Sequence, residues 1–285
     1  MKWFCYSFLL IFVLSIGFFC KSYFYLYREL NIHATEINSN SPLLQKAELK
    51  YHLGHDSQKI AFYSFPVKKP KAAIILVHGY SNPGGKNQML DHVDYLNKAG
   101  YSAYLLDLRS FGDSDGQKIS LGTKEWLDVL SFYDYLRLLP ENKNLKIGYF
   151  GFSMGASASI TALAQSGKGD FLIASVPFAS PESLYSFRLK QNKVSSFFTK
   201  LALRTQLGFS YPQYSAINNI SKIHVPLLIF QATKDEFVNS QDAKNLYDLA
   251  NSPKEFWSAD SGHDIYATLP QEFQQYVLSF LQNLK

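Results

Sequence analysis

The sequence is poor in cysteine. Only Cys5 and Cys20 occur among 285 residues, and both lie in the first 20. Two cysteines exclude a disulfide scaffold, and they argue against a cysteine-rich zinc site. Charged residues make up only 18% of the chain, whereas 47% of the residues are hydrophobic. This composition excludes intrinsic disorder, because the chain can bury enough apolar surface to offset the entropy lost on ordering.

Acidic residues are absent from residues 1–28, which contain Lys2, Lys21 and Arg28. The formal net charge of the whole chain is +5, so these three residues leave +2 for the remainder. A charge this small is ordinary for a soluble domain. The sequence therefore predicts no nucleic-acid partner.

Residues 3–20 contain no charged side chain. As a helix they would span roughly 27 Å, which is enough to cross the hydrocarbon core of a bilayer. Residues 1–28 are predicted to be a single-pass membrane anchor, with the rest of the chain outside the cytoplasm. The alternatives are a signal peptide cleaved near Ser15–Gly17, which would give a secreted protein, and a buried core helix. Polar residues 29–47 are predicted to be a stalk, followed by one domain over residues 48–285.

From residue 48 onward, short apolar runs alternate with longer amphipathic stretches. This alternation predicts an α/β fold with a mostly parallel eight-stranded sheet flanked by helices. In such a sheet, ligands bind beyond the carboxyl ends of the strands. The strands are expected at residues 48–53, 60–65, 72–77, 102–106, 146–150, 171–176, 227–230 and 254–257, and the helices near residues 86–98, 123–139, 153–165, 240–250 and 271–284.

The residues Gly151-Phe152-Ser153-Met154-Gly155 form a G-x-S-x-G pattern between a predicted strand and a predicted helix. This pattern is typical of a sharp strand-to-helix turn that exposes a nucleophilic serine. Ser153 is the candidate nucleophile. The backbone N–H groups of Met154 and of Tyr80, which follows the strand at 72–77, are predicted to form an oxyanion hole.

Two further groups follow strands near the carboxyl end. Asp235 comes after the strand at 227–230, with Glu236 as the nearest alternative, and His263 comes after the strand at 254–257. His263 could act as general base and Asp235 could orient it. The order serine, aspartate, histidine is the one expected of an α/β-hydrolase. Nucleophilic chemistry of this kind needs no metal and no organic cofactor.

The other histidines are given structural positions. His78 is predicted to structure the loop after its strand, and His224 marks the entrance of a strand. The four that remain lie in segments without a candidate nucleophile and are expected in solvent: His33, His52, His55 and His92.

With these motifs in place, the sequence from about residue 50 to the end resembles the α/β-hydrolase superfamily. The carboxyl third resembles the branch of serine aminopeptidase-like and X-Pro dipeptidyl peptidase-like hydrolases. The stretch from Asp107 to Gly116 is similar to a D-x-R-G-x-G-x-S-x-G stretch of that family, with Ser110 in place of a glycine. Asp107 and Arg109 are predicted to be structural, pairing with each other or binding backbone. Gln231-Ala232 replaces the usual His-Gly, and Asn239 stands where proline is common.

The predicted function is a membrane-anchored serine hydrolase that cleaves an ester, thioester or other acyl bond of a small-molecule, lipid or peptide substrate. A peptidase or lipase with the same three residues remains an alternative, as does a non-catalytic binding protein of the same fold. Residues 177–222 are predicted to form a small helical lid over Ser153. The alternative for this stretch is a crossover helix with a solvated basic face. As a lid, its aromatic and basic residues could touch lipid headgroups.

Overall fold

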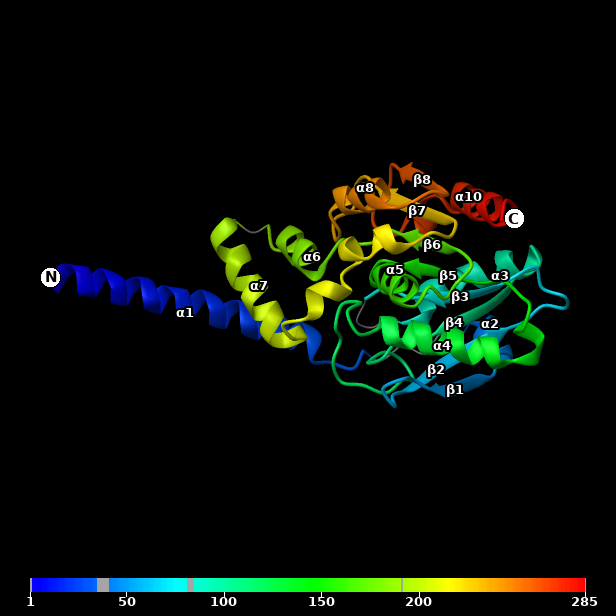
Figure 1. Ribbon diagram of the computed structural model, residues 1–285, viewed down its shortest axis with the longest axis horizontal. Coiled ribbons are helices and arrows are strands. Elements are labelled where there is room, and N and C mark those ends of the chain that lie inside the picture. Colours follow the sequence, from blue (N-terminus) through cyan, green and yellow to red (C-terminus); the bar gives the residue numbers. More distant parts are fainter. Residues whose placement is uncertain (1, 35–40, 81–84, 191, 285) are drawn as a thin grey trace.

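An eight-stranded sheet forms the centre of the computed structural model, which describes residues 2–34, 41–80, 85–190 and 192–284. The strand order is β1-β2-β4-β3-β5-β6-β7-β8 (Figure 1). β2 pairs antiparallel with β1 and β4, and all other neighbours are parallel. The prediction of an α/β-hydrolase fold with a mostly parallel eight-stranded sheet is confirmed. The strands are β1 (Leu49–Leu53), β2 (Lys59–Phe65), β3 (Ala73–Val77), β4 (Ser102–Leu106), β5 (Ile147–Phe152), β6 (Leu172–Ser175), β7 (Leu227–Ala232) and β8 (Lys254–Ala259).

Both faces of the sheet are covered, which explains why its central strands are apolar throughout. In β3, Ile75 and Val77 face one hydrophobic cluster, whereas Ile74 and Leu76 face the other. The first cluster includes residues of α4 (Trp126–Leu138), α5 (Met154–Ser166) and α8 (Ser240–Leu249). The second includes residues of α3 (Asp91–Lys98) and α10 (Pro270–Gln282). Two further helices are short: α2 (Pro42–Lys46) and α9 (Ile265–Thr268).

The helix predicted over residues 86–98 begins later in the structure. Residues Lys86–Met89 form a 3₁₀ turn, and α3 starts at Asp91. Lys86 is buried, and its Nζ lies 2.8 Å from the carboxylate of Asp107. The turn therefore brings a lysine inward to a buried acid, a pairing that the local sequence does not reveal.

Residues 177–222 form helices at the carboxyl edge of the sheet. α6 (Pro181–Arg188) starts at Ser180, whose hydroxyl accepts the N–H of Ser183. α7 (Lys193–Leu207) starts at Asn192, which accepts two backbone N–H groups in the same way. These side chains satisfy N–H groups that have no partner within the first helical turn. Three short 3₁₀ turns follow α7, at Tyr211–Tyr214, Ala216–Asn218 and Ile220–Lys222.

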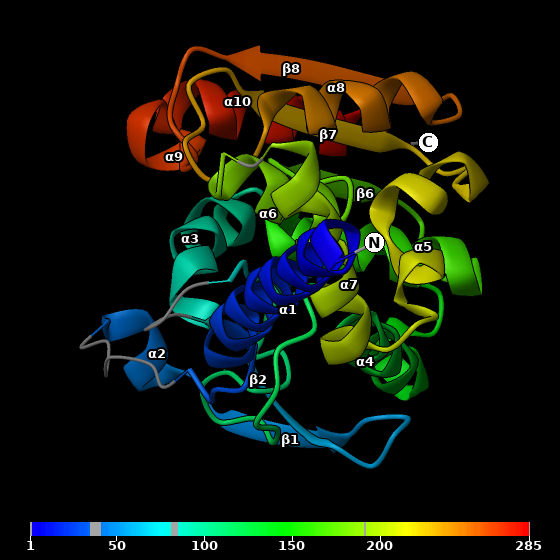
Figure 2. The same cartoon turned by 90° about the vertical axis from the view of Figure 1, so that its left-hand side faces the viewer.

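The amino-terminal helix α1 (Lys2–Leu30) projects away from the sheet, and α7 lies along its carboxyl half (Figure 1). Viewed nearly along its axis, α1 passes close to α6 and α7 (Figure 2). Residues Leu9–Leu30 are long and apolar enough to cross a membrane, with a mean hydropathy of 1.9 and 6% of the window buried. Leu26 and Leu30 are buried in the domain core, so the exposed apolar surface lies toward the amino terminus.

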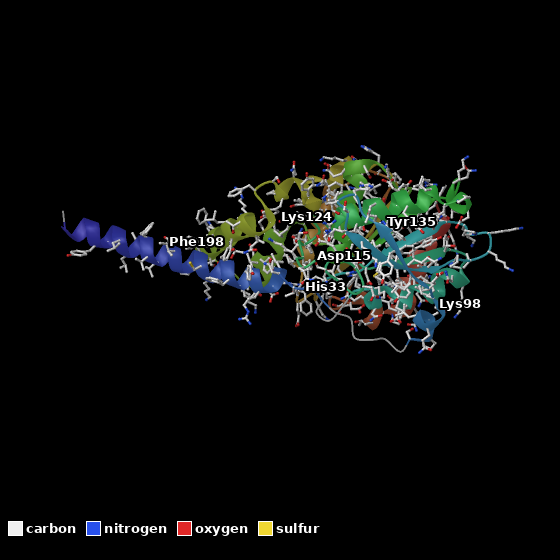
Figure 3. All side chains as sticks on the ribbon, turned by 90° about the horizontal axis from the view of Figure 1, so that it is seen from below. His33, Lys98, Asp115, Lys124, Tyr135 and Phe198 are labelled. Atoms are coloured by element: carbon white, nitrogen blue, oxygen red, sulfur yellow. The ribbon has the colours of Figure 1, made fainter. Side chains whose placement is uncertain are left out.

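The chain stays against the domain after α1 ends. His33 lies within hydrogen-bonding distance of the carbonyl oxygens of Gly116 (2.8 Å) and Gly112 (3.0 Å), at the base of α1 (Figure 3). Ala34 is buried and forms a β-bridge with Phe111. Of the predicted stalk over residues 29–47, residues 35–40 lie outside the described residues. The described parts are the end of α1, the packed segment 31–34 and α2.

Two histidines expected in solvent are buried, so that expectation was wrong for them. His52 in β1 packs against the rings of Phe62, Phe132 and Tyr135. His92 in α3 lies in a second aromatic cluster. Burial lowers the pKa of His52 to about 4 and that of His92 to about 3, because a charged imidazole loses its hydration there.

Candidate active site

Ser153 stands at the turn between β5 and α5. Its backbone has φ 52° and ψ −113°, a strained conformation for a residue with a side chain. The turn is also tightly packed. A Cβ on Gly151 would lie 2.5 Å from the Cα of Ala156, and a Cβ on Gly155 would lie 2.2 Å from the carbonyl oxygen of Val77. Only glycine fits at these two positions, so the G-x-S-x-G pattern has a steric cause here.

Asp235 and His263 meet beyond the ends of β7 and β8. His263 Nδ1 lies 2.6 Å from Asp235 Oδ2, although the two residues are 28 positions apart. The other carboxylate oxygen, Oδ1, accepts the backbone N–H groups of Phe237 (2.8 Å) and Val238 (2.9 Å). With three hydrogen bonds the carboxylate has a fixed orientation. Glu236, the alternative acid, is exposed.

The imidazole of His263 lies beside the serine turn. Its ring centroid is 5.0 Å from that of Phe152, which directly precedes Ser153, and 5.5 Å from that of Phe237. When Nδ1 donates to Asp235, Nε2 of a neutral imidazole carries the free lone pair. Such a nitrogen can accept a proton from a nearby hydroxyl. The structure thus gathers the three residues selected from the sequence at one edge of the sheet.

The loop after β3 lies against the same turn. A Cβ on Gly79 would lie 3.1 Å from the Cβ of Ser153, so the backbone passes directly beside the serine. The buried imidazole of His78 bonds to the carbonyl of Gly79 (2.7 Å) and accepts the N–H of Leu108 (3.0 Å). Burial lowers the pKa of His78, which keeps it neutral. His78 therefore holds this loop in place, as predicted. Residues 81–84 lie outside the described residues.

Met154 is the first residue of α5, so its N–H lies at the positive end of the helix. Tyr80 follows Gly79 in the loop beside Ser153. A developing negative charge on a substrate oxygen could be stabilised between two such N–H groups. The assignment of Tyr80 and Met154 to an oxyanion hole stays a prediction.

Asp107 and Arg109 have different partners from each other. Asp107 binds Lys86, whereas Arg109 pairs with Asp128 (2.6 Å) and with Asp56 (2.6 Å). Burial alone would lower the pKa of Arg109, but the charge and hydrogen bonds of Asp128 raise it. Burial raises the pKa of Asp128 to about 6 despite this pairing. These three ion pairs hold the loop after β4, which agrees with a structural role.

Two residues near the site were not selected from the sequence. Glu29 at the end of α1 accepts hydrogen bonds from the hydroxyl of Tyr80, through its carbonyl oxygen (3.3 Å) and its carboxylate (3.4 Å). Burial, with the nearby Glu29 charge, raises the pKa of Tyr80 to about 12. Arg188 lies over the rings of Tyr80 and Phe237, 5.9 Å from each centroid. The sequence did set Glu29 apart, because it is the first acidic residue of the chain.

The described residues contain no group of three or more His, Cys, Asp or Glu side chains placed to hold a metal ion. Ser153, His263 and Asp235 meet at the carboxyl edge of the sheet. A strained serine, an imidazole and a buried carboxylate suit nucleophilic attack on an acyl carbon.

Comparison with known proteins decides the family. Residues 68–216 match the family described as serine aminopeptidase, S33. The chain belongs to this family of α/β-hydrolases. A solved esterase of Pyrococcus furiosus has the same fold, with a TM-score of 0.71 and 23% identity over 89% of this chain and 98% of the esterase.

Two curated relatives are similar to this chain over about two thirds of its length or more. A carboxylesterase of Bacillus subtilis is 24% identical over 247 residues, which cover 77% of this chain and 96% of that enzyme. An uncharacterised protein of Salmonella typhimurium is 27% identical over 188 residues, or 65% of this chain. The match spans 61% of the length of the Salmonella protein. This family member is a serine hydrolase of the α/β-hydrolase type, and two of the similar proteins, from Bacillus subtilis and Pyrococcus furiosus, are named as esterases.

Proposed function

We propose that the chain is a membrane-anchored serine hydrolase that cleaves an ester or thioester through an acyl-enzyme. The observation that carries the proposal is the 2.6 Å hydrogen bond between His263 and Asp235, formed beside the strained turn of Ser153. Acyl transfer by a serine requires three parts: a fixed carboxylate, an oriented imidazole and a serine that can attack. Here two backbone N–H groups fix the carboxylate, and the serine lies at a helix amino terminus.

The proposed reaction has two halves. Ser153 Oγ attacks the carbonyl carbon while His263 Nε2 takes the hydroxyl proton, and the N–H groups of Tyr80 and Met154 stabilise the oxyanion. The bond to the leaving group then breaks, and His263 returns the proton to the leaving oxygen or sulfur. Water attacks the acyl-enzyme with the same help from His263, which releases the acid and restores Ser153. Asp235 stabilises the imidazolium in both halves.

The anchor is supported by the surface of α1. Its side chains from Leu9 to Leu14 are more than half exposed, and all of them are apolar. A signal-peptide cleavage after Gly17 would remove this apolar surface and leave the helix to begin at Phe18, whose ring stacks on Phe198 at 5.8 Å. The full-length protein should stay in the membrane fraction after alkaline carbonate washing, with Met1 or Lys2 at its amino terminus. Release into the wash, or a start at Phe18, would refute the anchor.

Labelling with a fluorophosphonate probe tests Ser153. The wild-type protein should be labelled and should hydrolyse p-nitrophenyl butyrate. Ser153→Ala should abolish labelling and lower turnover about 1,000-fold or more, because no other group can form the acyl-enzyme. Ser166→Ala, at the far end of the same helix, is the matched control and should retain both activities. Labelling that persists in Ser153→Ala, or is absent from the wild type, contradicts the assignment.

The role of Asp235 is tested with Asp235→Asn. An amide cannot replace the charge that stabilises the imidazolium, so kcat should fall about 1,000- to 10,000-fold while KM changes little. Glu236→Gln removes the exposed neighbouring charge and should leave kcat within about 2-fold of wild type. Equal losses in the two variants would show that Asp235 has no special role.

Peptide and lipid substrates remain open for the same three residues. A panel of acyl esters, lysolipids and short peptides, each compared with Ser153→Ala, would separate esterase, lipase and peptidase activity. A non-catalytic binding protein would turn over none of them, and that result would replace the proposed function.

A further inference from the structure

The peptide group between Gly79 and Tyr80 lies beside Ser153. A Cβ on Gly79 would lie 3.1 Å from the Cβ of Ser153. The backbone N–H of Tyr80 has no acceptor among the described residues, so it is free to bind a substrate oxygen. The proposed function uses this N–H to stabilise the oxyanion. Such stabilisation depends on a donor that is already held in place before the reaction begins.

His78 fixes one end of this peptide group. Its Nε2 accepts the N–H of Leu108 (3.0 Å), so its Nδ1 carries the proton and donates to the carbonyl oxygen of Gly79 (2.7 Å). A peptide group is planar, and in the trans form its N–H points away from its carbonyl oxygen. Holding the Gly79 carbonyl therefore sets one end of the group, and the Tyr80 end needs a support of its own.

The side chain of Tyr80 reaches from this peptide group to the end of α1. Its hydroxyl donates to Glu29, at the carbonyl oxygen (3.3 Å) and at the carboxylate (3.4 Å). The last four carbonyl groups of a helix have no partner within the helix, so the hydroxyl also satisfies the end of α1. The Tyr80 ring lies at 88° to the ring of Phe111, with centroids 6.3 Å apart, and the Arg188 guanidinium lies over it at 5.9 Å.

The end of α1 is itself fixed, because the domain holds it from several sides (Figure 1). Leu26 and Leu30 are buried in the domain core. The carbonyl oxygen of Leu30 accepts the N–H of Ile119 (2.8 Å), and the N–H of Ala34 donates to the carbonyl oxygen of Ser110 (2.8 Å). A contact with this helix end therefore ties Tyr80 to a rigid part of the molecule.

We propose that Glu29 and the Tyr80 side chain are positioning residues, through which the end of α1 holds the Tyr80 N–H in place beside Ser153. The last turn of the amino-terminal helix is then part of the active-site framework. This inference rests on the proposed function, which supplies the oxyanion that the N–H binds. The two side chains act on the transition state through the backbone, so their loss lowers kcat and leaves KM nearly unchanged.

The first test is Tyr80→Phe, which removes both bonds to Glu29 and keeps the ring and the backbone. In full-length protein, kcat for p-nitrophenyl butyrate per fluorophosphonate-labelled serine should fall about 10-fold, while KM stays within about 2-fold. Tyr27→Phe is the matched control. It removes the hydroxyl of a half-exposed ring two residues before Glu29 and should change neither constant.

The second test changes the acceptor. Glu29→Leu removes the carboxylate but leaves the backbone carbonyl, so kcat should fall less, by about 5-fold. Glu29→Gln keeps an acceptor oxygen and should restore the kcat that Glu29→Leu loses. Tyr80→Phe combined with Glu29→Leu should be no slower than Tyr80→Phe alone, because the hydroxyl through which Glu29 acts is already gone. Losses that multiply would show two independent effects and overturn the proposal.

A boronic acid reports on the oxyanion hole directly. Ser153 Oγ adds to the boron of n-butylboronic acid, and the tetrahedral adduct resembles the transition state. Its inhibition constant should rise in Tyr80→Phe by about the same 10-fold as kcat falls. A contact that is merely structural would lower the melting temperature and leave both the inhibition constant and kcat per labelled serine unchanged. That outcome refutes a positioning role.

The two levels of the proposal fail differently. If the wild type does not hydrolyse p-nitrophenyl butyrate, the proposed function is wrong and the positioning role falls with it. If the wild type is active and Ser153→Ala is not, but Tyr80→Phe keeps the wild-type kcat, the serine hydrolase stands and the support by α1 is refuted. Should Tyr80→Phe not fold, Glu29→Leu decides in the same way, with Glu29→Gln as its reference.

Discussion

Acid should destabilise this protein through His52, a buried imidazole outside the active site. His52 is 7% exposed and packs between Phe62, Phe132 and Tyr135. Burial lowers its pKa from 6.5 to about 4 in the folded protein. As the pH falls below 6.5, the unfolded chain binds a proton at this site and the folded chain does not. The contribution of the neutral His52 to the free energy of unfolding is therefore lost as the pH falls below 6.5, and the loss levels off near pH 4.

The size of the effect follows from the two pKa values. Between pH 7 and pH 5 the unfolded imidazole becomes almost fully protonated while the folded one stays neutral. The linkage relation then gives a loss of about 2 kcal/mol in the free energy of unfolding from His52 alone. His92 contributes in the same direction, since its pKa is lowered to about 3.

The assay compares urea unfolding of the full-length protein in detergent micelles at pH 7 and pH 5, followed by tryptophan fluorescence. His52→Phe fits an aromatic site and removes the proton acceptor, so its loss of stability on acidification should be about 2 kcal/mol smaller than that of wild type. His224→Phe removes an exposed imidazole and should leave the pH dependence unchanged. If His52→Phe loses as much stability as wild type, the pKa of the folded imidazole is not depressed and the reasoning fails.

Two other substitutions test the packing around the site. Gly155→Ala places a Cβ 2.2 Å from the Val77 carbonyl oxygen, so we expect it to cost about 3 kcal/mol or more in urea unfolding, whereas Gly262→Ala, with open space around it, should cost under about 1 kcal/mol. Arg109→Met leaves the fully buried carboxylate of Asp128 without its guanidinium and should lower stability by about 3–5 kcal/mol. Replacing Asp128 by Asn as well should recover part of the loss in thermal unfolding, and a single variant as stable as wild type would contradict the pairing.

Much of the fold was predictable because it depends on local patterns. The run at residues 72–77 is apolar at every position, and the structure forms β3 there with both faces buried. The G-x-S-x-G turn was also predictable, because its five residues have a fixed spacing and lie between an apolar strand and a helix-like stretch. The close contact of Gly151 with Ala156 arises within this strand-turn-helix unit, whereas the close contact of Gly155 with Val77 comes from the end of β3 and is visible only in the structure.

The site could be predicted only as a set of candidates. The sequence placed Asp235 and His263 after strands, and it left Glu236 as the nearest alternative to Asp235. Their hydrogen bond and the exposure of Glu236 became visible only when β7 and β8 were placed side by side. The prediction that His52 is solvated failed for a related reason, since its aromatic neighbours come from β2 and α4.

By itself, the sequence determined the strand-helix alternation, the serine turn and an apolar amino-terminal helix, because each follows from the order of neighbouring residues. Tertiary structure decided what the end of that helix does. Leu26 and Leu30 are buried in the domain core, and Glu29 contacts Tyr80 across 51 residues of chain. It also decided that Arg109 pairs with Asp128. These contacts join residues that only packing brings together, so no local pattern could encode them.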